Sequence, residues 1–268
     1  RVASEAPDTL LLAEAFWLME GYFVRTLGMH RVYNSAFMNF MKNEDNAKYR
    51  QSIKNILEFD PQILERHVNF LNNPDEETAV KQFGDGDKYF GVTLSMVTMP
   101  GLPMFGHGQV EGFSEKYGME YKKAYWNESV NWGLVSRHEK DIFPLMHSRK
   151  LFAHVEHFHL FDLYLEDGSV DENVFAYSNG SGDQRVLVFY HNRFAETSGW
   201  IKTSAEFLNK STGRLEKREL DYALGLSCSD NFVVFRDSIS GLQYIKKCSE
   251  ISRNGFFVKM NAYKYFVF

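Results

Sequence analysis

The sequence is poor in the features that crosslink a chain, carry it through a membrane or bind it to polyanions. Two cysteines occur among 268 residues, so a disulfide framework is excluded, and one bond is possible but not required. Thirty lysines and arginines face thirty-five aspartates and glutamates, with both signs interspersed and a formal net charge of −5. The longest apolar stretch, 90–105, is broken by Pro100 and Pro103 and is too short to span a bilayer. We therefore expect neither a nucleic acid nor a membrane as partner.

A targeting segment is missing as well, since nothing near the N-terminus resembles a signal peptide. The chain opens on Arg1 rather than on methionine, and we expect that its natural beginning is missing. The sequence does not determine the cellular compartment of the protein, and we slightly favour the cytoplasm. What the sequence does contain is 44% apolar, 24% charged and 16% aromatic residues, a composition typical of a globular protein with a substantial buried core.

Before residue 160, short apolar runs alternate with segments of helical spacing. A continuous apolar run of strand length is typical of a buried parallel strand, and apolar residues on one helical face predict an amphipathic helix. On these grounds the sequence predicts strands at 9–14, 67–72 and 102–105 and helices at 46–59, 88–99 and 142–158. Such alternation favours a parallel α/β construction.

After residue 160, the sequence changes to strands and turns. Strands are predicted over 185–190, 232–235, 255–260 and 263–268, and the last two are expected to form a hairpin. We therefore predict two domains, an α/β domain over 1–159 and an antiparallel β-sandwich over 160–268. A complete eight-stranded barrel needs about 250 residues. The four strand–helix units of the first domain, near Leu10, Arg31, His67 and Leu102, amount to half of one.

Glu14 is the first candidate for chemistry, because it directly follows an apolar strand. Barrel enzymes keep catalytic groups at the carboxyl ends of their strands. The apolar and aromatic residues that follow Glu14 would raise its pKa by desolvation, which suits a general acid. Its position alone favours a simpler interpretation, in which the carboxylate caps the next helix or pairs with an arginine.

Two further segments look ordinary when each is taken alone. Asp75 is a good helix N-cap, followed by Glu76 and Glu77 in the first helical turn. The loop 100–109 has two prolines and three glycines, which is typical of a tight turn.

Together, however, these segments resemble in order and spacing the second half of the catalytic barrel of the α-amylase family of retaining glycoside hydrolases and transglycosylases. The run 11–17 resembles the family's strand that ends in the general acid, which matches Glu14. Residues 29–34 are similar to the sixth strand, and the C-terminal strands to the family's closing domain. Two motifs match position by position: Phe70, Asn73 and Asp75 fit the one that supplies the transition-state carboxylate, and Pro100, Gly101, Pro103, Gly108 and Gln109 fit that of the eighth strand.

The resemblance implies strands 5–8 of a (β/α)8 barrel, an α-glucan or maltooligosaccharide substrate, and a retaining double displacement. We expect no cofactor. Glu14 would be the general acid/base, and Asp75 would stabilise the oxocarbenium-like state. The residues expected to contact sugar are Trp17, Tyr33, Asn34, Asn73, His107 and Gln109. For Trp17 and Tyr33, as for Trp126 and Trp132, packing in the core or at its rim is the more common use of a large ring.

The sequence departs from the family pattern at two points. Pro74 stands where the family usually has a histidine that binds the sugar, which puts ordinary starch hydrolysis in doubt. The family's nucleophile, an aspartate two residues after an arginine on the fourth strand, has no counterpart, because Arg236 and Asp237 have the wrong spacing. We therefore expect the chain to be a fragment that is inactive alone. Its open sheet should need the missing N-terminal half of the barrel or a second copy of the chain.

Two other functions remain open at this stage. The chain could be a non-catalytic carbohydrate-binding or structural remnant of such a barrel, or an unrelated α/β domain whose sandwich binds a protein. The histidines at 154, 157 and 159 could suggest zinc, but no fixed fourth ligand accompanies them. Solvated or packed histidines at a helix end are the favoured interpretation, and no metal is expected.

Overall fold

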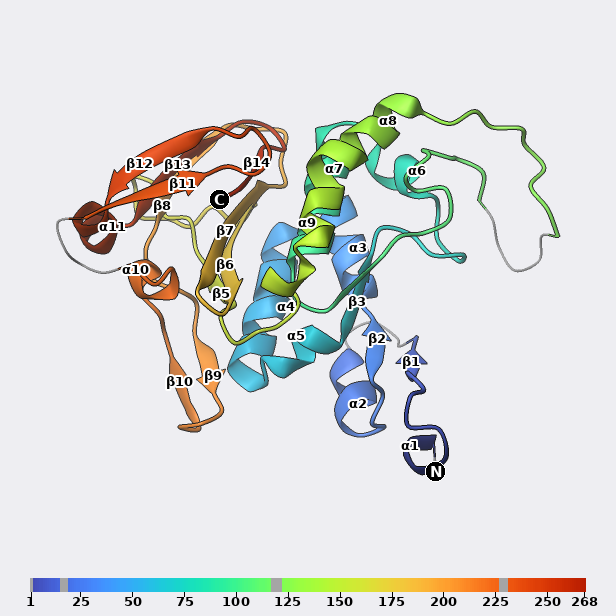
Figure 1. The fold of residues 1–268 in the computed structure, drawn as a ribbon, viewed down its shortest axis with the longest axis horizontal. Helices are drawn as coiled ribbons and strands as arrows, with labels where there is room; N and C mark the ends of the chain where they lie inside the picture. Colours follow the sequence, from blue (N-terminus) through green and yellow to red (C-terminus); the bar gives the residue numbers. More distant parts are fainter. Residues whose placement is uncertain (1, 15–18, 117–121, 227–230) are drawn as a thin grey trace.

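A computed structural model describes residues 2–14, 19–116, 122–226 and 231–268 of the chain (Figure 1). Its N-terminal part contains a sheet of four parallel strands in the order β1-β2-β3-β4. These strands are β1 (Leu12–Ala13), β2 (Arg31–Tyr33), β3 (His67–Phe70) and β4 (Leu102–Met104). Within the described residues the sheet stays open and no closed barrel forms, as half a barrel requires. The first strand is much shorter than the sequence predicted.

Helices follow or connect these strands. Along the chain they are α1 (Val2–Glu5), α2 (Glu20–Arg25), α3 (Ser35–Asn43), α4 (Asn46–Phe59), α5 (Gln62–Arg66), α6 (Ala79–Phe83), α7 (Asp87–Thr98), α8 (Trp132–Arg137) and α9 (Phe143–His147). The predicted helix 46–59 is confirmed to the residue, with Tyr49, Ile53 and Leu57 buried on one face. None of the helices described is long and apolar enough to cross a membrane.

The central antiparallel sheet has the strand order β14-β7-β6-β5. It consists of β5 (His159–Phe161), β6 (Val174–Ser181), β7 (Gln184–His191) and β14 (Tyr265–Val267). Three antiparallel pairs accompany it, β8 (Thr197–Ile201) with β13 (Phe256–Met260), β9 (Phe207–Asn209) with β10 (Arg214–Glu216), and β11 (Phe232–Arg236) with β12 (Gln243–Lys247). Two short helices, α10 (Leu220–Ala223) and α11 (Cys248–Asn254), complete the part of the chain that the structure describes.

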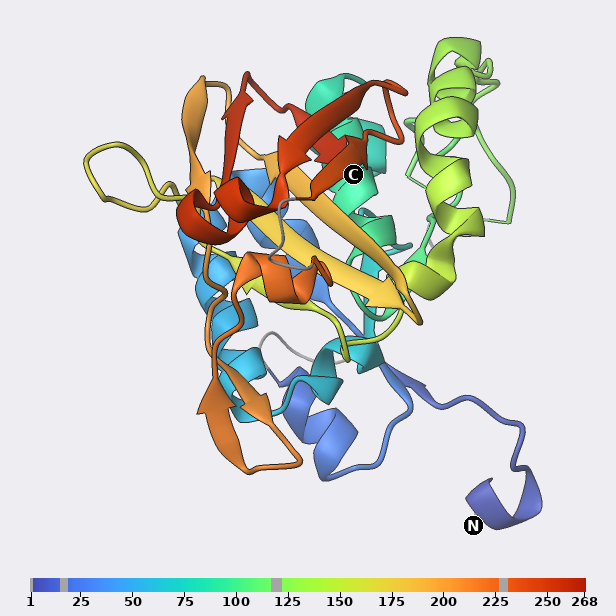
Figure 2. The ribbon, with the colours of Figure 1, turned by 60° about the vertical axis from the view of Figure 1, so that its left-hand side comes forward.

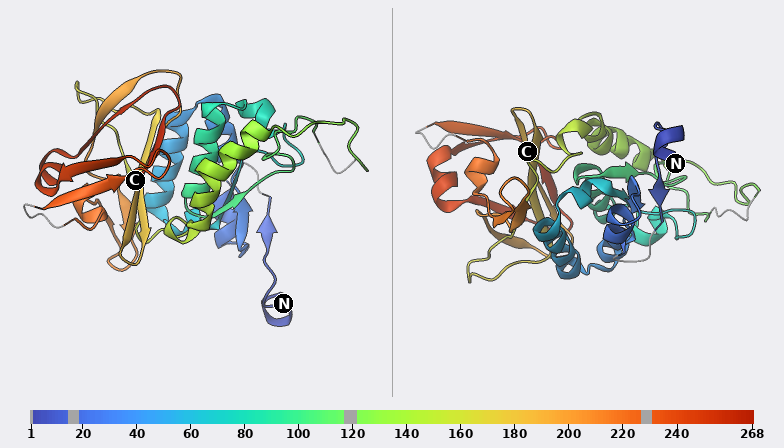
Figure 3. Two further views of the ribbon diagram at one scale, coloured as in Figure 1. Left: turned by 45° about the horizontal axis from the view of Figure 1, so that its top comes forward. Right: turned by 90° about the horizontal axis from the view of Figure 1, so that it is seen from below.

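The central sheet is buried on both faces (Figure 3). Because side chains alternate along a strand, Val188 and Tyr190 face the helices, whereas Leu187 and Phe189 face the outer strands. On the helix side, every residue of α7 from Tyr89 to Thr98 is buried. A Cβ atom added to Gly91 would lie 1.9 Å from the ring of Tyr190. Helix α7 therefore packs on the sheet so closely that only glycine fits at this contact.

Two predictions from the sequence are wrong. The segment 142–158 is not one helix: a π-helical turn at His138–Ile142 leads into α9, a 3-10 turn covers Arg149–Leu151, and turns follow up to β5. The spacing of its apolar residues correctly predicted burial, but the Arg149 guanidinium donates to the carbonyls of Val97, Met99 and Gly101 and holds the chain out of helical register.

The final strands also do not form the predicted hairpin. Strand β13 pairs with β8, and β14 pairs with β7 in the other layer. Alternating apolar residues predict a strand but not its partner, so the crossing between layers was not visible in the sequence.

Two polar networks connect the helices to the antiparallel strands. Arg50 on α4 has no exposed surface, and its Nε donates to Glu172 over 2.7 Å while its terminal nitrogens donate to Asp162 and to the carbonyl of Val174. Lys54, one turn further on, also binds Asp162. This guanidinium therefore fixes α4 to the end of β5 and to the start of β6.

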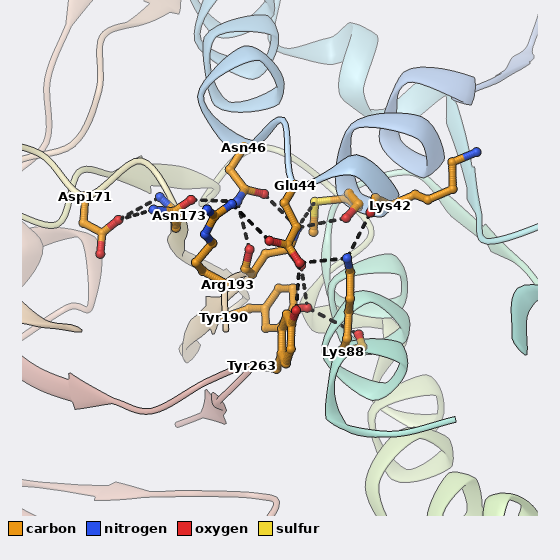
Figure 4. A network of polar contacts seen from close by, with 11 residues as sticks. Lys42, Glu44, Asn46, Lys88, Asp171, Asn173, Tyr190, Arg193 and Tyr263 are labelled. Atoms are coloured by element: carbon orange, nitrogen blue, oxygen red, sulfur yellow. Dashed lines mark hydrogen bonds and ion pairs between the residues drawn. The ribbon is translucent and has the colours of Figure 1, made fainter. Parts of the chain in front are cut away.

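The second network centres on Glu44, which adopts the left-handed conformation (φ 57°) between α3 and α4 (Figure 4). Its carboxylate accepts from Lys88 Nζ at 2.9 Å, from the Tyr263 hydroxyl at 2.8 Å and from Arg193 at 3.2 Å. Burial raises the pKa of Glu44, but the hydrogen bonds from Lys88 and Tyr263 outweigh it and hold the pKa below its usual value. The carboxylate is thus charged at neutral pH and joins three distant segments.

We expect Arg50→Met to lower the free energy of unfolding by about 3 kcal/mol, because it removes the buried guanidinium and its charge-assisted hydrogen bonds to Glu172, Asp162 and the carbonyl of Val174. Urea-induced unfolding at one protein concentration measures this loss. Lys48→Met on the exposed side of the same helix is the control and should change stability by less than about 0.5 kcal/mol. Equal effects of the two substitutions would show that the Arg50 contacts do not stabilise the fold.

Candidate functional site

The candidate site lies where the four parallel strands end. Parallel strands present their carboxyl ends at one edge of a sheet, and each strand here is followed by residues that the sequence analysis singled out. Glu14 follows β1, Asn34 follows β2, Asp75 lies in the loop after β3, and the loop after β4 carries His107 and Gln109. The structure therefore brings residues from four distant segments to the same edge.

Tyr33, the last residue of β2, lies at the same edge of the sheet as Glu14 and Asp75. Burial raises the pKa of Tyr33, and the negative charges of Glu14 and Asp75 raise it further. Both carboxylates are thus close enough to act on a single hydroxyl. The centroid of the Tyr33 ring lies 5.3 Å from that of the Phe70 ring on the neighbouring strand β3. This contact fixes the position of the Tyr33 ring.

Glu14 itself is exposed to solvent. The apolar enclosure that the sequence predicted is therefore absent among the described residues around it. Residues 15–18 lie outside the described part of the chain, and with them the predicted stacking residue Trp17.

The loop after β3 is shaped by Asn73, which is buried. Its side-chain oxygen accepts the backbone N–H groups of Asp75 and Glu76, both over 3.0 Å. The helix start expected at Asp75 is wrong, because α6 begins only at Ala79, with Thr78 at its N-cap. Since the side chain of Asn73 takes the backbone donors of this turn, the Asp75 carboxylate does not cap a helix and is exposed at the edge.

The loop after β4 is held by Gln109, whose side-chain oxygen accepts the N–H of Gly106 over 3.1 Å. Its backbone carbonyl accepts the Tyr89 hydroxyl at 2.8 Å, and the same hydroxyl lies 2.9 Å from His138 Nε2. Burial lowers the pKa of His138 to about 4, so its ring is neutral at pH 7. Because the Tyr89 proton goes to Gln109, the neutral His138 ring donates from Nε2.

Neither Tyr89 nor His138 was singled out from the sequence, since no motif surrounds either residue. The loop also fits tightly against β3. A Cβ atom on Gly106 would lie 2.4 Å from the side-chain amide of Asn72, so the glycine allows the two loops to approach each other.

Asn34 is part of the scaffold below this edge. It is 2% exposed, and its side-chain oxygen caps α3 by accepting the N–H of Phe37. Its amide nitrogen donates to Asn69 at 2.9 Å and lies 3.2 Å from His67 Nδ1. The predicted contact of Asn34 with sugar finds no support in this arrangement.

His107 is exposed and borders a small cavity of about 120 Å³ in the segment between β4 and α8. Trp126, half of whose surface is exposed, lines the same cavity. Glu128 is fixed there by the backbone N–H groups of Ser114 and Glu115. An aromatic face beside a histidine and a carboxylate is the kind of surface on which a sugar ring can stack.

The histidines considered for zinc do not share a helix face, because residues 152–158 form turns. Among the described residues, Glu65, His154 and Glu156 have potential metal-ligating atoms within 4.8 Å of one another. His154 Nδ1 lies 3.6 Å from Glu65, and both His154 and Glu156 are exposed. This surface cluster is separate from the edge that carries Glu14 and Asp75.

No family model matches the sequence, and no curated protein is significantly similar to it. Solved structures are similar in fold. An alpha-amylase from Geobacillus thermoleovorans matches 99% of this chain with 54% of its own, at a TM-score of 0.62 and 11% identity. An alpha-amylase from H. orenii matches 99% with 54% of its own, at 0.61 and 15% identity. The debranching enzyme of Nostoc punctiforme matches 99% with 52% of its own, at 0.62 and 11% identity.

The chain therefore spans about half the length of these enzymes. The resemblance to the α-amylase family is confirmed at the level of the fold, which is that of about half of such a barrel enzyme together with antiparallel strands. An identity of 11–15% carries no information on individual residues.

We expect both Glu14→Gln and Asp75→Asn to lower the pKa of Tyr33, because each removes a negative charge that disfavours the phenolate. The pKa should stay above that of an exposed tyrosine, since burial is the largest cause of the shift. NMR titration of ring-labelled tyrosine, with the signal assigned through Tyr33→Phe, measures the change. Glu76→Gln is the control and should leave the pKa of Tyr33 unaltered. If the pKa also stayed the same in Glu14→Gln and Asp75→Asn, the two carboxylates would not share one site.

Proposed function

We propose that this chain is part of a glycoside hydrolase or transglycosylase that acts on α-glucans, with Glu14 and Asp75 in its catalytic site. The observation that carries the proposal is that Glu14, directly after β1, and Asp75, in the loop after β3, lie at the carboxyl edge of one parallel sheet. Enzymes with this kind of barrel perform their chemistry at that edge. The fold matches alpha-amylases and a debranching enzyme. In this proposal, β1–β4 correspond to strands 5–8 of the barrel.

The reaction proposed is a retaining double displacement. In the first step, the Glu14 carboxyl gives its proton to the glycosidic oxygen while the bond from that oxygen to the anomeric carbon breaks. A nucleophilic carboxylate forms a bond to the same carbon. In the second step, the Glu14 carboxylate removes a proton from water or from an acceptor hydroxyl, which attacks the anomeric carbon and releases the nucleophile. The exposure of Glu14 leaves it accessible to both the leaving oxygen and the incoming one.

Asp75 stabilises the positive charge that develops on the sugar ring between these steps. Its position depends on Asn73, whose side chain holds the backbone of the turn through two hydrogen bonds. Tyr33, Asn73, His107 and Gln109 stay in the proposal as residues that contact sugar or shape the loops around it. Asn34 and Trp17 are kept as candidate sugar contacts only because the family pattern implies them.

The nucleophile must come from another segment. The Asp237 carboxylate, which follows an arginine, is 1% exposed and accepts the backbone N–H groups of Ile239, Ser240 and Val267 among the antiparallel strands. These bonds give Asp237 a structural role. In this proposal the missing N-terminal half of the barrel supplies the nucleophile, and a second copy of the chain is the alternative partner for the open sheet.

A second function is a carbohydrate-binding or structural remnant that has lost catalysis. It is favoured by the exposed Pro74 in place of the family's sugar-binding histidine and by the burial of Asn34 and Gln109. Binding of a maltooligosaccharide without turnover by the full-length protein would support it. An unrelated α/β domain, the third function considered from the sequence, does not agree with the fold match.

In the full-length protein, Glu14→Gln should slow the cleavage of maltooligosaccharides with poor leaving groups by about 100-fold or more, because the proton donor is lost while the shape is kept. The rate of cleavage should fall less for a substrate whose leaving group needs no proton. The control, Glu76→Gln, changes a carboxylate next to Asp75 and should keep the rate. Unchanged cleavage by Glu14→Gln would exclude this residue as the acid.

The 268-residue chain alone should show no turnover of a chromogenic maltooligosaccharide and should not stay monomeric. Leu12 on β1 and Leu102 on β4, each 44% exposed, lie on the outer strands of the open sheet, and such edges tend to pair. Light scattering and the assay check the two parts. A stable monomer would contradict the half-barrel assignment, and turnover would show that the nucleophile lies within this chain.

A further inference from the structure

A groove of about 590 Å³ lies on the antiparallel side of the molecule, where the start of β5, the strands β7 and β9, the segment after β10 and α10 come together. It is distinct from the carboxyl edge of the parallel sheet, and none of the residues assigned above to the catalytic site lines it. Figure 2 shows the β9–β10 hairpin beside α4, and Phe207 on β9 lines the groove. A volume of this size is within the range of small-molecule sites.

The groove is lined by two arginines, Arg185 and Arg218, together with His157 and His159. Burial lowers the pKa of His159 to about 3, and the positive charges of Arg218 and Arg185 contribute to this shift. The imidazole is therefore neutral at pH 7, and both guanidinium groups act on it. One carboxylate, that of Glu156, also lines the groove, and that of Glu216 pairs with Arg218 at 3.3 Å.

The Nδ1 atom of His159 is not accessible from the groove. The residue is only 8% exposed, and this atom is buried without a hydrogen-bond partner among the described residues. The ring packs 5.1 Å from that of Phe207. Recognition of a ligand in the groove therefore depends on the two arginines and on Tyr222.

Aromatic rings complete the groove. Tyr222 is 70% exposed, and the Arg218 guanidinium lies 4.9 Å from its ring centroid and 5.5 Å from that of Phe207. Contact with two rings restricts the motion of Arg218. The exposed face of Tyr222 can stack against the apolar face of a sugar ring.

A second hollow of about 280 Å³ continues from the groove and shares Phe207, His159 and Arg218 with it. It adds the uncharged polar side chains of Gln62, Asn209 and Ser211 and the cationic side chain of Lys210. Side chains of this kind suit the hydroxyl groups of a sugar.

We propose that this groove binds an anionic sugar, a phosphate ester whose phosphate lies between Arg185 and Arg218 and whose ring stacks on Tyr222. Guanidinium groups bind phosphate oxygens in pairs of parallel hydrogen bonds. The proposal does not depend on the catalytic role of Glu14 and would hold for a non-catalytic protein as well.

Isothermal titration of the full-length protein with glucose 6-phosphate tests the proposal, with glucose, glucuronate and inorganic phosphate as comparison ligands. We expect glucose 6-phosphate to bind at least ten times more tightly than glucose or glucuronate, and inorganic phosphate to bind more weakly than the ester. Equal binding of glucose would overturn the role of the arginines, and preferred binding of glucuronate would overturn the assignment to phosphate. No heat from glucose 6-phosphate at millimolar concentration would overturn the site.

Variants then locate the binding. Arg185→Gln should weaken glucose 6-phosphate at least tenfold, whereas Arg214→Gln, an exposed arginine on β10 outside the lining of the groove, should not. Tyr222→Ala should weaken the sugar phosphate and leave inorganic phosphate unaltered. Thermal midpoints of the three variants verify that each is folded. Equal affinities of the two arginine variants would show that the phosphate is bound elsewhere.

Discussion

Burial of the central antiparallel sheet on both faces is the constraint on which the rest of the structure depends. Tyr177 and Tyr190 on one face pack among the helices, while Ala176 and Phe189 on the other pack against the outer strands. Both hydrophobic cores include side chains of this sheet. The apolar faces of the helices therefore cannot be buried unless the C-terminal strands are in place. The division at residues 159 and 160 therefore stays a prediction, because the core on the helix side includes residues from both sides of it.

Much of the local structure could be predicted from the sequence, because periodicity reports which residues are buried. Helix α4 begins and ends where the pattern placed it, and β3 and β4 occupy their predicted positions. Two of the errors concern long-range contacts. The bonds of Arg149 to three carbonyls interrupt helix 142–158, and the crossing of the chain between layers separates β13 from β14. Neither contact leaves a periodic signal in the sequence.

The candidate site shows the same difference between what the sequence predicts and what it does not. The order of Glu14, Asp75 and the loop 100–109 was enough to predict that they meet at one edge, because parallel strands align their carboxyl ends. The roles of the amide side chains could not be predicted in this way. Asn34 and Asn73 look like sugar ligands in a motif, but where a strand turns into a loop their side chains satisfy backbone N–H groups. A sequence motif therefore does not separate a residue that touches substrate from one that positions its neighbour.

The contacts of Glu44 have a consequence for how the chain reaches its folded state. Its carboxylate binds Lys88, Arg193 and Tyr263, which are 44, 149 and 219 positions away along the chain. Pairings at such separations slow folding, because a long loop must close before any stabilisation is gained. Synthesis on the ribosome runs from the N-terminus, so the partner Tyr263 emerges long after Glu44. Until then α3 and α4 lack a contact at their junction, and the nascent helices would expose apolar surface for which a chaperone could compete.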